Sequence, residues 1–325
     1  VDHESNVWFV SSRQGVLKLV PDRFTDISTI AGLESMVVNS TCLFGGDLYM
    51  GTDKGLVVLD RENFKKKENE LTEYLEGIRI RSIKRDSKGN LWLCAYGDAA
   101  LTCYTSDRQI ISYTQEDGLA SNRIRTMMEL SDGRLAVSAS GGVSILQNGK
   151  IVTTYDSGDG IYNSEILALE EDEEGRLYMG SDGDGIYVIE GNKISRLGVE
   201  DGLTSEVVMR LKRDNSGTIW IVTSNSIEYM RDEQITAIDT FPYSNNFDIY
   251  FDKYDRAWVL ASNGIYVTRV DELLANEGIE YTLYDVKSGL PYITTANSRS
   301  EIDEEGNLYI SGRSEERRVG EECRS

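Results

Sequence analysis

The residues that could carry out catalysis are unevenly represented in this chain of 325 residues. It contains one histidine, His3, and 55 acidic residues. A Ser–His–Asp or Cys–His arrangement would have to use His3, which the sequence places in a turn, so nucleophilic catalysis is disfavoured. Paired carboxylates can cleave glycosidic bonds, but so many acidic residues produce accidental pairs at every spacing. We therefore predict no catalytic residues.

Two Asp-Gly segments carry closely spaced oxygen atoms of the kind that Ca²⁺ prefers. One contains Asp182 and Asp184, and the other contains Asp156 and Asp159. Position 12 counted from Asp182 is Lys193 rather than the acidic residue of an EF-hand loop. We interpret both segments as turns and expect no metal and no cofactor.

The cysteines show no spacing typical of a zinc site. Cys42, Cys94 and Cys103 lie far apart and form no CxxC pair. We expect them to be buried thiols within strands.

Ligand binding by loop residues is the chemistry that remains. Arg123, Tyr162, Asn163 and Tyr292 supply a cation, an amide and two aromatic rings, which are groups that orient small molecules in binding sites. We predict these four as ligand-binding residues. The prediction requires that the fold bring their loops to one face.

The elements that would position these loops repeat about every 42 residues. In six of the units an Asp precedes an aromatic residue by six positions, as Asp86 precedes Trp92. The units are anchored at Trp8, Tyr49, Trp92, Ala136, Tyr178, Trp220, Trp258 and Tyr309. A period near 40 with strand-type units is typical of a β-propeller, whose function lies in its loops.

One unit shows the expected local structure. Runs 124–130, 135–139, 143–146 and 151–155 are separated by turn sequences such as Asn148-Gly149, so they predict one four-stranded antiparallel blade. The first and last units are incomplete, and we expect seven blades plus a partial extra repeat, with eight blades as the alternative. The aromatic anchors should fill the wedges between blades. One short helix, at 271–276, is expected as a surface excursion within a blade.

In a propeller, the loops that link one blade to the next share a face with the loops between the second and third strands. On that face we expect Tyr96, Asp98, Asn122, Arg123, Tyr162, Asn163, Asp182, Asp184, Glu206, Asn225, Asn263 and Tyr292. The four predicted binding residues are among them. The turns of the opposite face, such as 131–134 and 173–176, are expected to be structural.

A second phrase, Asp-Gly-Leu followed closely by Ser or Asn, recurs between units at 117–119 and 201–203, with related forms at 159–161 and 288–290. Together with the strand, turn and aromatic anchor that follow, it resembles the two-component regulator propeller repeat over residues 1–312. That resemblance implies a non-catalytic sensor region on the extracytoplasmic side of a bacterial hybrid histidine kinase or diguanylate cyclase. It also implies glycan fragments or other small molecules as ligands, a homodimer in the full-length receptor, and membrane attachment only through segments outside this fragment.

Alternative functions are a protein-interaction scaffold and, with less support, a propeller lyase or glycosidase. The net charge of −21 disfavours nucleic acid and anionic lipid as partners. No run of 18 apolar residues occurs, so we expect no membrane span within the chain. Residues 313–325 abandon the repeat and resemble a translated sequencing adapter, and we exclude them from the fold.

Overall fold

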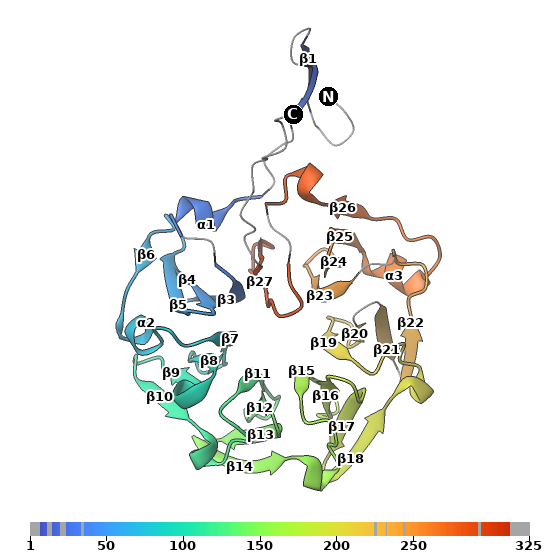
Figure 1. The fold of residues 1–325 in the computed structure, drawn as a ribbon. Coiled ribbons are helices and arrows are strands. Elements are labelled where there is room, and N and C mark those ends of the chain that lie inside the picture. Colours follow the sequence, from blue (N-terminus) through green and yellow to red (C-terminus); the bar gives the residue numbers. More distant parts are fainter. Residues whose placement is uncertain are drawn as a thin grey trace, which may run out of the picture.

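The computed structural model describes residues 24–33, 36–223, 226–231, 233–242, 245–291 and 294–312, and the backbone of 7–11 and 15–19. Four-stranded antiparallel blades stand side by side in a ring around a central axis (Figure 1). An all-β propeller with four-stranded blades is confirmed.

Among the residues that the structure describes, six blades are complete, and each contains four strands in order from the axis outwards. The first blade contains β3 (Val38–Phe44), β4 (Asp47–Thr52), β5 (Gly55–Asp60) and β6 (Lys66–Lys67), and the second contains β7 (Ile80–Arg85), β8 (Leu91–Ala95), β9 (Leu101–Tyr104) and β10 (Ile110–Tyr113). The third contains β11 (Ile124–Glu129), β12 (Leu135–Ala139), β13 (Gly142–Gln147) and β14 (Lys150–Tyr155), and the fourth contains β15 (Ile166–Glu171), β16 (Leu177–Ser181), β17 (Ile186–Glu190) and β18 (Lys193–Leu197). The fifth contains β19 (Val208–Arg213), β20 (Ile219–Thr223), β21 (Ile227–Arg231) and β22 (Gln234–Ala237), and the sixth contains β23 (Asn246–Phe251), β24 (Arg256–Ala261), β25 (Gly264–Arg269) and β26 (Thr282–Tyr284).

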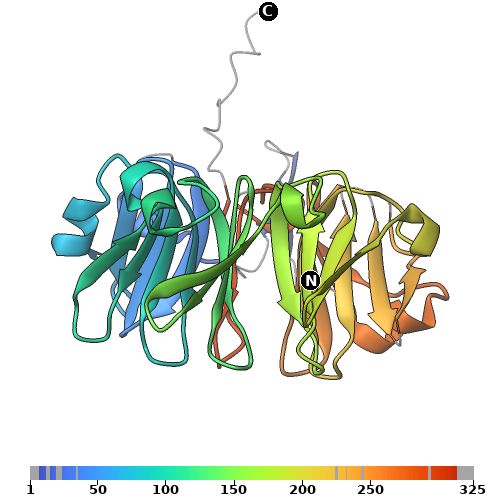
Figure 2. The same cartoon turned by 90° about the horizontal axis from the view of Figure 1, so that it is seen from below.

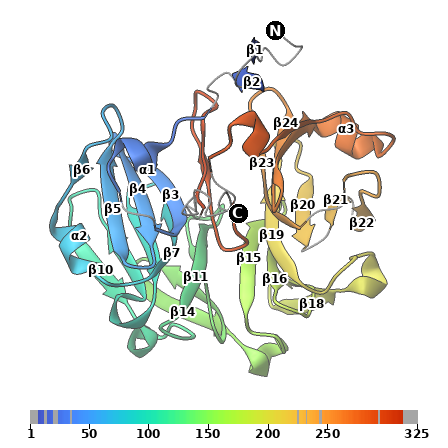
Figure 3. The same ribbon diagram turned by 45° about the horizontal axis from the view of Figure 1, so that its top comes forward.

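The expected number of blades was wrong. The seventh ring position, between the first and sixth blades, holds the two-stranded sheet β27 (Glu301–Ile302) and β28 (Leu308–Tyr309), and no further strand of the described residues pairs with it (Figure 1). A second pair, β1 (Val7–Ser11) and β2 (Gly15–Leu19), forms its own sheet apart from the ring (Figure 3). The anchors Trp8 and Tyr309 each mark only two paired strands, so counting anchors overestimates the number of blades.

The incomplete seventh sheet is fastened mainly to the first blade. The Val38 N–H donates to the Gly312 carbonyl at 3.0 Å, and the Thr41 N–H donates to the Arg299 carbonyl at 3.1 Å. Arg61 pairs with Asp303 at 2.7 Å. The Tyr309 ring packs into the hydrophobic cluster of β3, β4 and β5. These contacts hold residues 298–312 between two complete blades.

The second strand of each blade carries the core. All five residues of β8, β12, β16 and β20 are buried, whereas the outermost strands β14 and β18 contain only exposed and half-buried residues. Neighbouring blades cover both faces of the inner strands, so these strands are apolar on both sides instead of alternating. This packing explains the continuous apolar runs in the sequence.

The recurring Asp and aromatic residue are joined by a hydrogen bond. The aromatic N–H or O–H donates to the Asp carboxylate in four units, namely Trp92 to Asp86 at 2.9 Å, Tyr178 to Asp172 at 3.0 Å, Trp220 to Asp214 at 2.8 Å and Trp258 to Asp252 at 3.0 Å. The same carboxylates accept N–H groups of the turn between the first two strands, as Asp86 does from Lys88 and Asn90. The six-residue spacing therefore links a turn to an inter-blade wedge, and the predicted wedge role is confirmed for the buried rings.

Short helical segments occupy the connections. They are α1 (Ile27–Ile30), α2 (Glu70–Tyr74), α3 (Val270–Ala275), η1 (Gly97–Ala99), η2 (Gln115–Asp117), η3 (Ser157–Asp159), η4 (Val199–Asp201) and η5 (Val286–Ser288). Helix α3 lies between β25 and β26, which confirms the expected excursion within a blade. Cys42, Cys94 and Cys103 are buried free thiols, as expected, and burial raises the pKa of both Cys94 and Cys103 to about 12.

Candidate functional site

The loops that link blades do share a face with the loops between second and third strands. Their backbones bond from blade to blade: the Gly97 N–H donates to the Asn122 carbonyl at 2.9 Å and the Gly183 N–H to the Glu206 carbonyl at 3.2 Å. Figure 2 shows the ring from the side, with short helical linkers gathered along one rim and hairpin turns along the other. We call the linker side the loop face.

Arg123 lies on the loop face at the start of β11 and is exposed. Its guanidinium carbon is 5.3 Å from the centre of the Tyr96 ring, which belongs to the preceding blade. Arg79 approaches the same ring at 5.9 Å. This arrangement places two cations around one aromatic ring at a junction between blades.

Tyr162 and Asn163 lie on the next linker and have different surroundings. The Tyr162 side chain is 82% exposed. The Asn163 N–H donates to the Tyr187 hydroxyl at 2.8 Å, and its side-chain amide donates to the Asp182 carbonyl at 2.7 Å. Asn163 thus fastens the linker to its own blade, while Tyr162 is presented to solvent.

Tyr292, the fourth predicted residue, lies outside the described residues. Arg123, Tyr162 and Asn163 come from adjacent linkers of one face, as predicted, but none of them lines the cavities described next. Their role in binding stays a prediction.

A channel along the ring axis is the polar site that loop-based reasoning missed. Its lining includes the third and fifth residues of several innermost strands. The third residues are Thr126, Ala168 and Arg210, and the fifth residues are Lys84, Met128, Glu170 and Lys212. A bulge after the first residue of each strand sets this register.

Two cavities occupy the channel and share Arg210 and Arg299 as lining residues. Their volumes are 220 Å³ and 290 Å³. The basic residues that line them are Arg81, Lys84, Arg85, Arg125, Arg210, Lys212 and Arg299, and the acidic ones are Glu129, Glu170 and Asp182. A chain with a net charge of −21 therefore concentrates basic groups at its centre.

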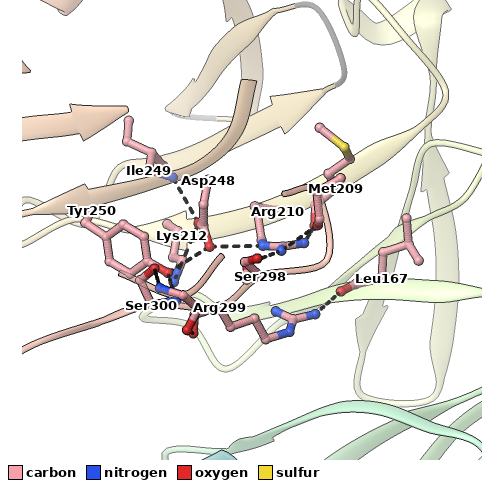
Figure 4. A network of polar contacts seen from close by, with 12 residues as sticks. Leu167, Met209, Arg210, Lys212, Asp248, Ile249, Tyr250, Ser298, Arg299 and Ser300 are labelled. Carbon is pink, nitrogen blue, oxygen red and sulfur yellow. Dashed lines mark hydrogen bonds and ion pairs between the residues drawn. The ribbon is translucent and has the colours of Figure 1, made fainter. Parts of the chain in front are cut away.

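Arg210 is fully engaged in structural contacts (Figure 4). Its Nε donates to Asp248 at 3.1 Å, and one terminal nitrogen donates to the carbonyls of Ala296 at 2.8 Å and Ser298 at 2.9 Å. The Tyr250 hydroxyl donates to the same Asp248 carboxylate at 2.9 Å. Burial opposes ionisation of Asp248, but Lys212 and Arg210 outweigh it and lower its pKa. Arg210 therefore pins residues 296–298 near the axis.

Three other cations in the channel have few partners. Arg299 donates to the Leu167 carbonyl at 2.8 Å (Figure 4). The Lys212 ammonium is 3.9 Å from an Asp248 oxygen. The Lys84 ammonium forms no hydrogen bond or ion pair with any residue that the structure describes.

The Lys84 side chain is exposed to solvent, although protein lies on all sides of it, as expected for a side chain in an open channel. The surrounding protein limits hydration of the ammonium and lowers its pKa to about 8, and repulsion by Lys212 and Arg299 acts in the same direction. Burial also lowers the pKa of Arg299, and repulsion by Arg210 acts in the same direction. The three cations thus disfavour one another in a confined space.

A sequence signal for the channel exists but is indirect. Lys84, Arg210 and Lys212 interrupt the first strand runs of their units, whereas the equivalent fifth position in β11 is Met128. Aligning the units by their first strands would place Lys84 and Lys212 at one level of the ring, with Arg210 two residues earlier.

A cavity of 490 Å³ lies at the incomplete seventh blade. Apolar residues of the first and sixth blades, including Met50, Trp258 and Tyr284, line it together with Leu308 of β28. It lies beside β28, where the outer strands of a complete blade would stand, and we interpret it as a feature of the architecture. No helix in the described part of the chain is long and apolar enough to cross a membrane.

No protein-family model and no curated protein matches the sequence. Solved structures do match. The extracellular domain assigned to the hybrid two-component system BT3049 from B. thetaiotaomicron aligns with a TM-score of 0.75 and 20% identity, over 96% of this chain and 43% of that one. The extracellular domain of the BT4673 one-component system from the same organism gives 0.72 and 19%, over 96% and 44%. This chain thus spans less than half the length of both domains.

A virginiamycin B lyase from Staphylococcus aureus, with a TM-score of 0.66 and 11% identity, aligns over 86% of this chain and 93% of that one. Likeness at such identities establishes the fold and leaves the activity open. The chain therefore has the propeller fold of these extracellular receptor domains, as the Asp-Gly-Leu repeat predicted.

Proposed function

We propose that this chain is a non-catalytic, ligand-sensing propeller on the extracytoplasmic side of a bacterial transmembrane receptor. The observation that carries the proposal is the composite loop face, in which the linker that enters one blade bonds to a turn of the preceding blade. A ligand that contacts two neighbouring loops there would bridge two blades. Its binding energy could then change how the blades pack, which is what a sensor requires.

The ligand we propose is a small molecule or oligosaccharide held by Arg123, Tyr162, Asn163 and Tyr292. The exposed Tyr162 ring offers a flat apolar surface with a polar end, which suits stacking against a sugar. The Arg123 guanidinium adds hydrogen-bond donors at the neighbouring junction. The anchors Trp92 and Trp220 cannot serve in this way because both are buried.

A propeller lyase is the second candidate, favoured by the likeness to a streptogramin B lyase, which aligns over 97% of each chain at a TM-score of 0.66. One related structure is a catalytically inactive lyase variant in which a histidine is replaced by alanine. The single histidine here, His3, lies outside the described residues. Incubation with streptogramin B antibiotics would test this candidate, and ring opening that survives His3→Ala would favour an enzyme with a different base.

The sensor proposal is tested by measuring binding of an oligosaccharide panel by thermal shift and calorimetry. Tyr162→Ala should weaken binding of any active glycan by at least tenfold. Tyr254→Ala is the matched control, since Tyr254 is 63% exposed in the β23–β24 turn of the opposite face. The proposal fails if no glycan stabilises the protein, or if both variants weaken binding equally.

A further inference from the structure

We propose that the axial channel binds a small oxyanion, bearing carboxylate, sulfate or phosphate groups, between Lys84, Lys212 and Arg299. This site lies in the 290 Å³ cavity, apart from the loop-face residues. Anion binding at this site does not depend on whether the loop face binds a sugar.

The three cations come from different parts of the ring and converge on one cavity. Lys84 is the fifth residue of β7, Lys212 is the fifth residue of β19, and Arg299 precedes β27. Arg299 is held in place because its backbone exchanges hydrogen bonds with β3, donating to the Asn39 carbonyl at 2.8 Å. Groups on rigid strands around an axis are suited to enclosing a compact ligand.

The nearby carboxylates are already occupied and do not neutralise Lys84. Glu129 accepts from the N–H and hydroxyl of Ser87, both at 2.6 Å. Glu170 accepts from the N–H groups of Glu171 at 3.2 Å and Arg213 at 3.1 Å, and burial raises its pKa.

Two further carboxylates near the cavity are engaged as well. Glu301 accepts from the Leu43 N–H at 2.5 Å and from Arg85 at 2.8 Å. Asp248 accepts from Arg210 and Tyr250 and lies 3.9 Å from the Lys212 ammonium, so it offsets part of the charge of Lys212, whereas the Lys84 ammonium has no ion-pair partner among the described residues.

A purely structural role explains this cluster poorly. Holding an unpaired ammonium close to other cations costs free energy even where water has access, whereas an apolar residue such as Met128 takes the equivalent position of β11 without that cost. Cations held together against their mutual repulsion are typical of sites that bind anions. The cavity is close to the lower end of the volumes of small-molecule pockets, about 300 Å³, so a compact anion fits better than a polymer.

The test titrates phosphate, sulfate and tricarballylate separately into the protein at constant ionic strength set with chloride. Thermal shift and calorimetry would report binding, and the three arms distinguish phosphate, sulfate and carboxylate ligands. We expect saturable binding of at least one anion and an increase in Tm. The absence of saturable heat for all three would overturn the proposal.

Lys84→Met removes the charge and keeps a long side chain, and Lys88→Met, in the exposed turn after β7, is the matched control. We expect Lys84→Met to weaken binding at least tenfold and, without anion, to melt higher than the parent. Lys212→Met provides a second test of affinity if Lys84→Met does not fold. Equal loss of binding in Lys84→Met and Lys88→Met would indicate general charge screening and would contradict the proposal. A lower Tm of anion-free Lys84→Met than of the parent would indicate that the lysine is structural, and this result would contradict the proposal as well.

Discussion

Replacing Asp172 or Tyr178 should reveal how much the repeated Asp–aromatic contact stabilises a blade. One Asp172 oxygen accepts from the Glu174 N–H at 3.1 Å and the Arg176 N–H at 2.8 Å. The other accepts from the Arg176 side chain at 2.6 Å and from the Tyr178 hydroxyl at 3.0 Å. The Asp172 and Tyr178 residues are only 8% and 3% exposed, so water cannot readily replace a lost partner.

The expected costs follow from those partners. A hydrogen bond to a charged group contributes about 1.5–3 kcal/mol, so Tyr178→Phe should lower the free energy of unfolding by about 1.5 kcal/mol. Asp172→Asn loses the charge and part of the acceptor capacity, which should cost about 3 kcal/mol. At about 2 cal/mol/K of unfolding entropy per residue, each kcal/mol lowers the Tm of a chain of this size by about 2 °C.

A double-mutant cycle measured by urea unfolding separates the contact from other effects. In the Asp172→Asn background, Tyr178→Phe should cost less than half of what it costs in the parent. Tyr162→Phe is the control, because its exposed hydroxyl has no partner among the described residues, and it should change stability by less than about 0.5 kcal/mol. The reasoning is refuted if Tyr178→Phe is as silent as Tyr162→Phe.

The contribution of Asp172 to the free energy of unfolding should also depend on pH. Burial acts to raise the pKa of Asp172, but its hydrogen bonds with Arg176 and Tyr178 outweigh burial and lower the pKa below 3.8. A carboxylate with a lowered folded-state pKa stabilises the protein above pH 3.8 and loses that contribution as pH falls through the folded value. The stability difference between parent and Asp172→Asn should therefore narrow below about pH 4. A difference that stays constant down to pH 2 would contradict this explanation.

Three further perturbations test the channel, a turn and a buried carboxylate. Because the pKa of Lys84 falls from 10.5 to about 8 on folding, the unfolded chain binds more protons between these values, and stability relative to Lys84→Met should rise with pH across that window. Because solvent reaches Lys84, we expect the free energy of unfolding relative to Lys84→Met, measured with urea, to rise by only about 1 kcal/mol between pH 7.5 and 10. A difference between the two proteins that does not change with pH would contradict this expectation. At Gly142, where φ is +148°, an added Cβ would lie 2.1 Å from the Tyr155 carbonyl oxygen. Gly142→Ala should therefore lower the free energy of unfolding by at least about 2 kcal/mol. The control Gly133→Ala, in an open turn, should lower it by less. Glu228 is fully buried, one of its carboxylate oxygens has no hydrogen-bond partner among the described residues, and burial raises its pKa. Glu228→Gln should therefore raise the free energy of unfolding by about 1 kcal/mol at pH 7 and leave it unchanged near pH 3.

Much of the architecture follows from local sequence. Turn residues such as Asn148-Gly149, with φ of 50° and 75°, delimit short strands, and the fixed Asp-to-aromatic spacing marks a turn, a second strand and a wedge. The alternation of linkers and turns also predicted correctly that Arg123, Tyr162 and Asn163 lie on one face. These features depend on residues close together in the chain, so a single unit of sequence is enough to specify them.

The tertiary structure decided the number of blades and the character of the centre. Tyr309 looks like any other anchor in sequence, but its sheet consists of β27 and β28, and no third strand among the described residues pairs with them. Lys84, Lys212 and Arg299 are separated by scores of residues and meet only when the ring closes, with a bulge in each innermost strand shifting its register. Strands covered on both faces show no alternation that would separate an axial position from a buried one. The sequence by itself therefore determined the repeating blade, and only closure of the ring placed the cations around a common channel.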